Sequence, residues 1–446
     1  MRMDLQPYGQ PRPEVEAPPE WHFPTPEIHT LANGLTVWVY HRPGQYVVSA
    51  SLVLDVPLDI EESDLEGIAT ISLHTLDEGT LDHPGTSYAE VLESSGAVFG
   101  GSVTLSATTC SVEMPVTSYG RAMALFAEAV RTPALADDDV TRHVALRLAD
   151  IEQHRANSSH LAGVLTRRAV FDAGSRASRM NGGTSASVAR VTPEAVRQFH
   201  QTWYSPVGAV LVVAGDFLGS DPLPAVEAAF GDWAPSPGHP LHLPSRPGSA
   251  RPYVIGRDGS VQADVRLAAF SIDRHDPRWA PLQVASYAMG GAFLSRLNRV
   301  LREDRGYTYG ISMSPHPLRS GGYWTVGGSF RNEVVAAAVE ETQAILDISH
   351  SPFTEVEVSQ AVSFLTGVAP LRYATAQGVV EQAAALAAAG LDPGYVDRSL
   401  TRLRQVTAAE ATAAYTELVH DPILVVVGDP TALAGLGHPI ETVPEL

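Results

Sequence analysis

The sequence contains no lysine, so its 30 basic residues are all arginines. They are outnumbered by 50 Asp and Glu residues, which gives a formal net charge of −20. Nucleic-acid-binding proteins need a basic face that displaces counterions from phosphates, and anionic membrane surfaces attract the same kind of face. The charge balance therefore argues against a nucleic-acid or membrane partner.

Cysteine and long apolar segments are also scarce. Cys110 is the single cysteine, so an internal disulfide is excluded and nothing indicates an oxidising compartment. No run of about 18 apolar residues, the length that spans a membrane, occurs in the sequence. Residues 1–21 lack the apolar stretch of a secretory signal. We therefore expect a cytoplasmic protein.

The strongest organising feature is an internal repeat. Residues 191–217 (VTPEAVRQFHQTWYSPVGAVLVVAGDF) and residues 406–430 (VTAAEATAAYTELVHDPILVVVGDP) both predict a capped helix followed by a buried strand that ends in Gly-Asp. Two copies of one pattern in a chain of 446 residues indicate two domains of one fold. Because each half mixes strand-like runs with long helical patterns, the predicted class is α+β.

The predicted domain boundaries follow from composition. Residues 1–25 are rich in proline and glutamate and are expected to form an extended N-terminal arm. Residues 236–252 have the proline and glycine content of a linker. They separate a first domain over 26–235 from a second domain over 253–446.

Residues 67–80 (GIATISLHTLDEGT) resemble the zinc-site helix of the M16 peptidase family, which includes insulinase, pitrilysin and the mitochondrial processing peptidase. The family pattern is G-[LI]-A-H-x-x-E-H-x-x-x-x-G-T, an inverted zincin motif. It needs two histidines four residues apart on one helix face and a glutamate beside them as general base. In this sequence His74 matches the pattern, whereas Thr70 stands at the first histidine position and Leu73 at the general-base position.

The third zinc ligand of the family is a distal glutamate, and its position falls on Asp150. Thr70 is a poor zinc ligand and Leu73 cannot accept a proton from water, so we expect no working zinc site in this chain. Weak metal binding by His74 and Asp150 is the alternative. His143, Asp150 and His154 share a helical face, which we interpret as a polar surface stripe.

Residues 288–312 (AMGGAFLSRLNRVLREDRGYTYGIS) are similar to the signature of the M16 C-terminal domain. After Gly290-Gly291 they match the pattern S-R-L-x-x-x-L-R-E-x-R-G-x-x-Y. The resemblance implies that Arg302 grips a substrate carbonyl or carboxylate and that Tyr309 donates its hydroxyl to the developing oxyanion. The alternative is that Arg302 belongs to a surface ion pair and Tyr309 is a packed strand aromatic.

A further predicted substrate contact lies in the first domain. Gly100, Gly101, Ser102 and Val103 fall where active family members present an edge strand to an extended substrate. Such a strand can pair with a peptide backbone, although packing is the commoner role of a strand.

The family resemblance covers nearly the whole chain, and it implies two tandem homologous domains that form half a clamshell. Each domain would be a mostly antiparallel β-sheet packed against helices. The disabled zinc motif and the intact Arg302 and Tyr309 predict a subunit of a heterodimeric M16B zinc metalloendopeptidase that has no cofactor of its own and is inactive alone. Its partner would carry zinc on an intact H-x-x-E-H, and a peptide would be the substrate. The alternative is an inert scaffold, like the core proteins of respiratory complexes.

Overall fold

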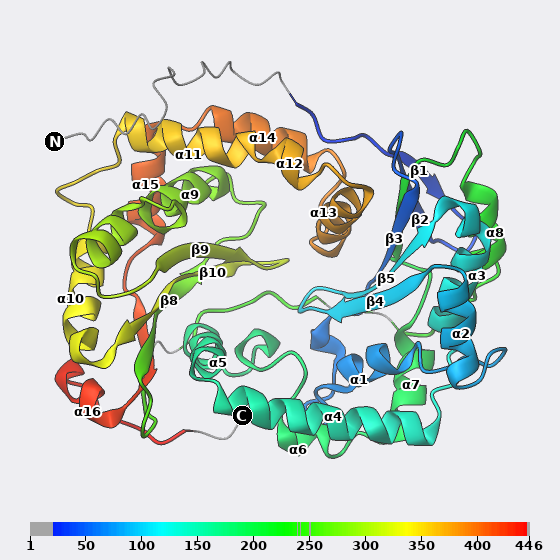
Figure 1. Ribbon diagram of the computed structural model, residues 1–446, viewed down its shortest axis with the longest axis horizontal. Coiled ribbons are helices and arrows are strands. Elements are labelled where there is room, and N and C mark those ends of the chain that lie inside the picture. Colours follow the sequence, from blue (N-terminus) through cyan, green and yellow to red (C-terminus); the bar gives the residue numbers. More distant parts are fainter. Residues whose placement is uncertain (1–20, 239, 241, 249–250, 444–446) are drawn as a thin grey trace, which may run out of the picture.

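The computed structural model describes residues 21–238, 240, 242–248 and 251–443 and has two halves, each a β-sheet covered by helices (Figure 1). The sheet of the first half has six strands in the order β1-β2-β6-β3-β5-β4. Neighbouring strands run antiparallel except β2 and β6, and β4 forms one edge of the sheet. The strands are β1 (Glu27–Thr30), β2 (Thr36–His41), β3 (Val47–Leu54), β4 (Val98–Val103), β5 (Thr108–Pro115) and β6 (Val210–Gly215).

The sheet of the second half repeats this topology. Its five strands follow the order β7-β11-β8-β10-β9, and β7 and β11 are its parallel pair. If β1 is set aside, every strand of one sheet has a counterpart at the same place in the other. The duplication predicted from the sequence repeat is therefore confirmed. The strands are β7 (Tyr253–Gly256), β8 (Gln262–Ser271), β9 (Ile311–Pro317), β10 (Gly322–Arg331) and β11 (Ile423–Gly428).

The helices of the first half include those predicted from the zinc motif and from the sequence repeat. The two zinc-motif helices are α1 and α4, and α7 is the repeat helix, whose N-cap Thr192 accepts a hydrogen bond from the Ala195 amide. The helices are α1 (Ile68–Thr75), α2 (Thr86–Ser94), α3 (Tyr119–Arg131), α4 (Asp137–Ala156), α5 (Ser158–Val170), α6 (Ser185–Val188), α7 (Pro193–Trp203) and α8 (Leu223–Phe230). Short 3₁₀ segments are η1 (Leu58–Ile60), η2 (Val116–Ser118) and η3 (Arg176–Ser178).

The second half has the matching repeat helix α15, which Thr407 caps through the Glu410 amide. Its helices are α9 (Trp279–Ser286), α10 (Val335–Leu346), α11 (Glu355–Gly367), α12 (Ala369–Arg372), α13 (Ala376–Ala388), α14 (Tyr395–Arg404), α15 (Ala408–Leu418) and α16 (Pro430–Leu433). The π-helical segments are η4 (Tyr287–Gly291) and η5 (Asn298–Asp304), and the 3₁₀ segments are η6 (Asn332–Val334) and η7 (Ala434–Leu436). Within the described ranges, no helix is long and apolar enough to cross a membrane.

Each half contributes one helix that packs on the sheet of the other half. Helix α5 of the first half packs on β8 and β11 of the second sheet, and α13 of the second half packs on β3 and β6 of the first (Figure 1). The buried clusters cross the halves accordingly. Tyr40 and Val212 of the first sheet belong to the apolar core of the second half, and Ile255 and Val425 belong to that of the first. The packing therefore crosses the predicted boundary between 26–235 and 253–446.

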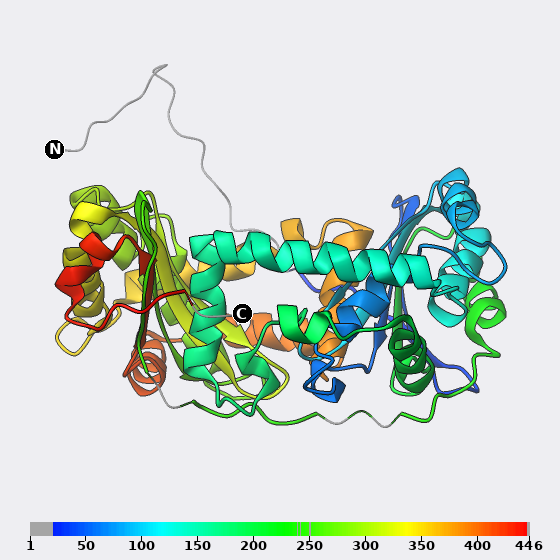
Figure 2. The ribbon, with the colours of Figure 1, turned by 90° about the horizontal axis from the view of Figure 1, so that it is seen from below.

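The chain segments outside the two halves also contact both. Of the predicted arm, residues 1–20 lie outside the described residues, whereas Trp21 stacks on Tyr373 with ring centroids 5.8 Å apart. The described residues of the linker run along one side of the molecule from one half to the other (Figure 2). There His242 Nε2 lies 2.6 Å from Asp55 Oδ1, and Arg319 of the second half contacts the same oxygen at 3.3 Å. The linker is thus tied to both halves.

Candidate functional site

Buried charges hold the beginning of α1, the helix that carries the degenerate zinc motif. The Glu61 carboxylate accepts hydrogen bonds from the amides of Gly67 (3.0 Å) and Ala69 (3.1 Å), where the helix dipole favours a negative charge. Arg176 donates to the other oxygen of Glu61 at 2.8 Å, and both side chains are almost fully buried. Gly67 has φ of +102°, and a Cβ there would lie 2.7 Å from the Gly182 carbonyl oxygen, so the close approach requires glycine.

Facing residues of α1 and α4 line a pocket of about 310 Å³. The structure brings together three of the four degenerate zinc positions here, namely Thr70, His74 and Asp150. The pocket is lined by Thr70, Ile71 and His74 from α1 and by His143, Leu146, Arg147 and Asp150 from α4. The fourth position, Leu73, is buried and packs against β4, where a Cβ on Gly101 would lie 2.8 Å from Leu73 Cδ1.

An arginine that the sequence analysis missed occupies this pocket. The Arg147 guanidinium forms an ion pair with Asp150, the distal ligand position, and donates from Nε to the Gly182 carbonyl at 2.8 Å. Its side chain is only 14% exposed. Arg147 precedes Asp150 by three residues on one helix, a spacing that places two side chains on the same face. This spacing was the available signal in the sequence.

The two histidines of the pocket, His74 and His143, contact each other, and His143 also contacts a carboxylate. The rings of His74 and His143 meet edge to face with centroids 6.1 Å apart, and His143 Nε2 lies 2.7 Å from Glu78 Oε1. Partial burial, and then the charges of His143 and Arg147, lower the pKa of His74. These effects disfavour the charged form of the His74 imidazole.

The predicted stripe of His143, Asp150 and His154 is half-buried, and each member has a partner. His154 Nε2 lies 3.4 Å from Asp150, and its ring stacks on His160 with centroids 3.8 Å apart.

The residues of the pocket do not fit a catalytic zinc ion. Such an ion needs three protein ligands and a base for its water. Thr70 offers only a hydroxyl, and Leu73 at the general-base position offers no acid–base group. Of the other pocket residues, Asp150 is paired with Arg147 and His143 lies against Glu78, which leaves His74 as the one imidazole without a carboxylate contact among the lining residues. Among the residues that the structure describes, no group of three or more His, Cys, Asp or Glu side chains is placed to hold a metal ion.

The predicted substrate strand is the edge strand β4. Gly100, Gly101, Ser102 and Val103 pair with β5 on one side only, with Gly101 opposite the buried Cys110. The strand packs against α1 and so lies beside the zinc-motif helix. Its position leaves a backbone edge that can accept an extended chain.

Arg302 and Tyr309 lie in the second half, and neither lines the α1/α4 pocket. Arg302 is part of η5, and its guanidinium lies 3.7 Å from the centroid of the Phe293 ring. It donates from Nη2 to the Phe293 carbonyl and from Nε to Glu303, both at 2.8 Å. These contacts hold the guanidinium in place, and the ion pair with Glu303 is the contact that the alternative interpretation of Arg302 predicts.

Tyr309 follows η5 and is 95% exposed, so its hydroxyl reaches solvent. The Asn298 side chain of η5 hydrogen-bonds both the carbonyl (2.9 Å) and the amide (3.1 Å) of Ile311 in β9, so it joins the two elements that flank Tyr309. Tyr309 is therefore not the packed strand aromatic of the alternative interpretation.

Comparison with known proteins identifies the family. Residues 36–181 match the family model for insulinase (peptidase family M16), and residues 190–365 match the model for the peptidase M16 inactive domain. An uncharacterized zinc protease of Mycobacterium leprae is 25% identical over 286 residues, which are 63% of this chain and 64% of that protein. The chain thus spans just under two thirds of this relative. An uncharacterized zinc protease of Mycobacterium tuberculosis is 24% identical over 407 residues, 88% of this chain and 91% of that protein.

Solved structures share the fold. A peptidase M16 inactive domain from Pseudomonas fluorescens superposes with a TM-score of 0.83 at 22% identity and covers 91% of this chain and 97% of its own. A chain of Complex III2 from Candida albicans superposes with a TM-score of 0.77 at 15% identity, over 92% of this chain and 97% of its own. The two family models and the shared two-domain fold show that this chain belongs to the peptidase M16 family.

Proposed function

We propose that this chain is the zinc-free subunit of a two-chain M16 metallopeptidase and that it supplies Arg302 and Tyr309 to an active site on its partner. The observation that carries the proposal is the contrast between its two halves. In the first half an arginine is paired with the distal ligand position, whereas in the second half Arg302 is held by Phe293 and Glu303 and Tyr309 is 95% exposed.

The partner would be an M16 chain with an intact H-x-x-E-H and its zinc, and the substrate would be a peptide. Zinc held by the partner's H-x-x-E-H would supply an activated water and a Lewis acid for the scissile carbonyl. In this chain, the Tyr309 hydroxyl is the group that would donate to the oxyanion, and the guanidinium of Arg302 would bind a carbonyl or carboxylate of the peptide. The backbone edge of β4 would be available to align an extended segment.

An inert scaffold is the second candidate. The specific observation in its favour is the likeness of fold to a chain of Complex III2 from Candida albicans. Against it stands Tyr309, since a tyrosine that is 95% exposed serves no packing role within this chain.

The experiment is to co-express this chain with an M16 chain that is encoded beside it and retains H-x-x-E-H. Each chain and the co-purified pair are assayed for cleavage of a fluorogenic peptide library, with and without a zinc chelator. We expect chelator-sensitive cleavage by the pair, none by this chain alone, and stoichiometric zinc in the partner only. A stable pair that cleaves no faster than the partner alone supports the scaffold.

A further inference from the structure

We infer that the positive charge of Arg147 in the α1/α4 pocket, together with the loss of the family's zinc ligands, prevents a metal ion from binding there. The inference rests on the proposed function, because it describes how a zinc-free M16 subunit holds its zinc-motif helices together and prevents metal binding between them. The role of Arg147 does not follow from the family motif, which contains only the zinc ligands and the general base.

The contacts of Arg147 leave its guanidinium little freedom. It is ion-paired with Asp150 one turn away on α4, and its Nε donates to the Gly182 carbonyl at 2.8 Å. The guanidinium also lies close against Gly182, where a Cβ would be 2.6 Å from its central carbon. A side chain held by two acceptors and a backbone surface is not a mobile surface charge.

These contacts join three elements. Gly182 belongs to the loop before α6, and its carbonyl oxygen also lies close to Gly67 at the beginning of α1. Arg147 therefore connects α4 to the loop against which α1 begins. In the family pattern the zinc ligands fall on both helices, so a bound metal ion would join them. Here the guanidinium joins α4 to the loop beside α1 with a single positive charge.

The charge has a direct consequence for metal binding. Asp150 is the only carboxylate in the lining of the pocket, and its charge is already balanced by Arg147. A divalent cation that entered the pocket would compete for that carboxylate and be repelled by the guanidinium. Two like charges within about 6 Å in a partly buried site lower an affinity by at least about 10-fold.

The rebuilt motif is the triple variant Thr70→His, Leu73→Glu, Asp150→Glu. The added methylene of glutamate is expected to be needed for reach, because aspartate is shorter than the family ligand. The rebuilt motif leaves Arg147 beside the new carboxylate, so the inference predicts that these three changes together do not produce tight zinc binding.

The experiment measures zinc affinity of the single chain by competition with a chromophoric chelator. It compares the rebuilt motif with the same protein carrying Arg147→Gln. The matched control carries Arg155→Gln, which removes the same charge from α4 at a residue paired with Glu152 and outside the pocket. We expect Arg147→Gln to raise the zinc affinity of the rebuilt motif at least about 10-fold and Arg155→Gln to change it less than about 2-fold.

Two further variants keep the test decisive. Arg147→Lys retains the charge in the rebuilt motif and should leave the affinity low, and Arg147→Met replaces Arg147→Gln if the latter does not fold by circular dichroism. Equal zinc affinity with and without the charge at position 147, or an equal gain from Arg155→Gln, would overturn the inference. Stoichiometric zinc in the unaltered chain would instead contradict the proposed function.

Discussion

The buried pair of Glu61 and Arg176 permits a quantitative prediction. Glu61 has no exposed side-chain surface and Arg176 has 3%, and Arg176 also donates to the Asn181 carbonyl at 2.8 Å. Arg176→Met removes the cation and leaves a buried carboxylate. Breaking a buried pair by removing one partner typically costs about 3–5 kcal/mol, so we expect the free energy of unfolding to fall by about 3 kcal/mol or more at pH 7.

The pH dependence of the lost unfolding free energy distinguishes an effect of charge from an effect of packing. Burial already raises the pKa of Glu61, against the opposing effect of Arg176. Without Arg176 the folded-state pKa rises further above that of the unfolded chain, so the folded variant takes up a proton first as the pH falls. The stability difference from the unaltered protein should therefore shrink between pH 7 and pH 5.

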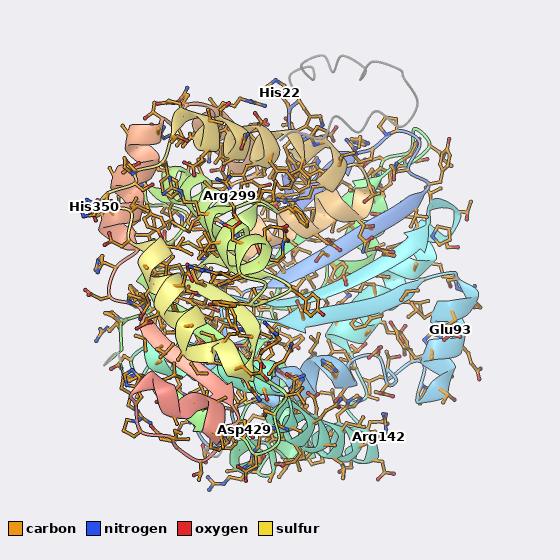
Figure 3. All side chains as sticks on the ribbon, turned by 60° about the vertical axis from the view of Figure 1, so that its left-hand side comes forward. His22, Glu93, Arg142, Arg299, His350 and Asp429 are labelled. Atoms are coloured by element: carbon orange, nitrogen blue, oxygen red, sulfur yellow. The ribbon has the colours of Figure 1, made fainter. Side chains whose placement is uncertain are left out.

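Urea unfolding followed by circular dichroism at both pH values measures the two quantities. The control is Arg142→Met. Arg142 lies on the outside of α4 (Figure 3), is 46% exposed, and forms ion pairs with Glu78 and Asp139 that this change breaks. It should cost less than about 1 kcal/mol. A loss in Arg176→Met no larger than that of the control, or one that is the same at both pH values, would refute the reasoning.

Three further predictions concern single contacts. Phe293→Ala removes the ring that stacks on Arg302 and should raise KM of the reconstituted pair about two- to five-fold with zinc content unchanged; an unchanged KM would contradict it. Hydrogen bonds from Arg296 lower the pKa of Glu357 to about 2, so this pair stabilises the fold above about pH 4.5 and the stabilisation is lost as the pH falls towards 2. Glu357→Gln should therefore cost about 1 kcal/mol in urea unfolding at pH 7 and nothing near pH 2, and an equal cost at both would count against the pair. Gly67→Ala should lower the urea midpoint more than Gly44→Ala, because both have positive φ and only Gly67 faces a backbone oxygen; equal midpoints would remove the role given to that contact.

Local features of the fold follow from the sequence. The zinc-motif resemblance predicts a helix within residues 67–80, where α1 lies, and the repeat predicts the matching α7–β6 and α15–β11 units. These features depend on helix caps and short apolar runs, which are local in the chain.

The long-range features do not follow from such patterns. An apolar helix face does not specify which sheet it covers, so the exchange of α5 and α13 is invisible in the sequence. A residue pattern with the spacing of an α-helix likewise does not predict that η5 is a π-helix. The contact of Arg147 with the Gly182 carbonyl depends on a loop that is distant in the chain, so the spacing of Arg147 and Asp150 does not predict it.

The most direct test of the account is Tyr309→Phe in the reconstituted two-chain peptidase. The account predicts a fall in kcat on the order of 10²-fold, because one oxyanion donor is lost, while the zinc content and the assembly of the pair stay unchanged. Arg302→Ala in the same pair should act more on KM, since a substrate grip contributes to ground-state binding. Full cleavage by the Tyr309→Phe pair would contradict the account and would leave this chain as a scaffold.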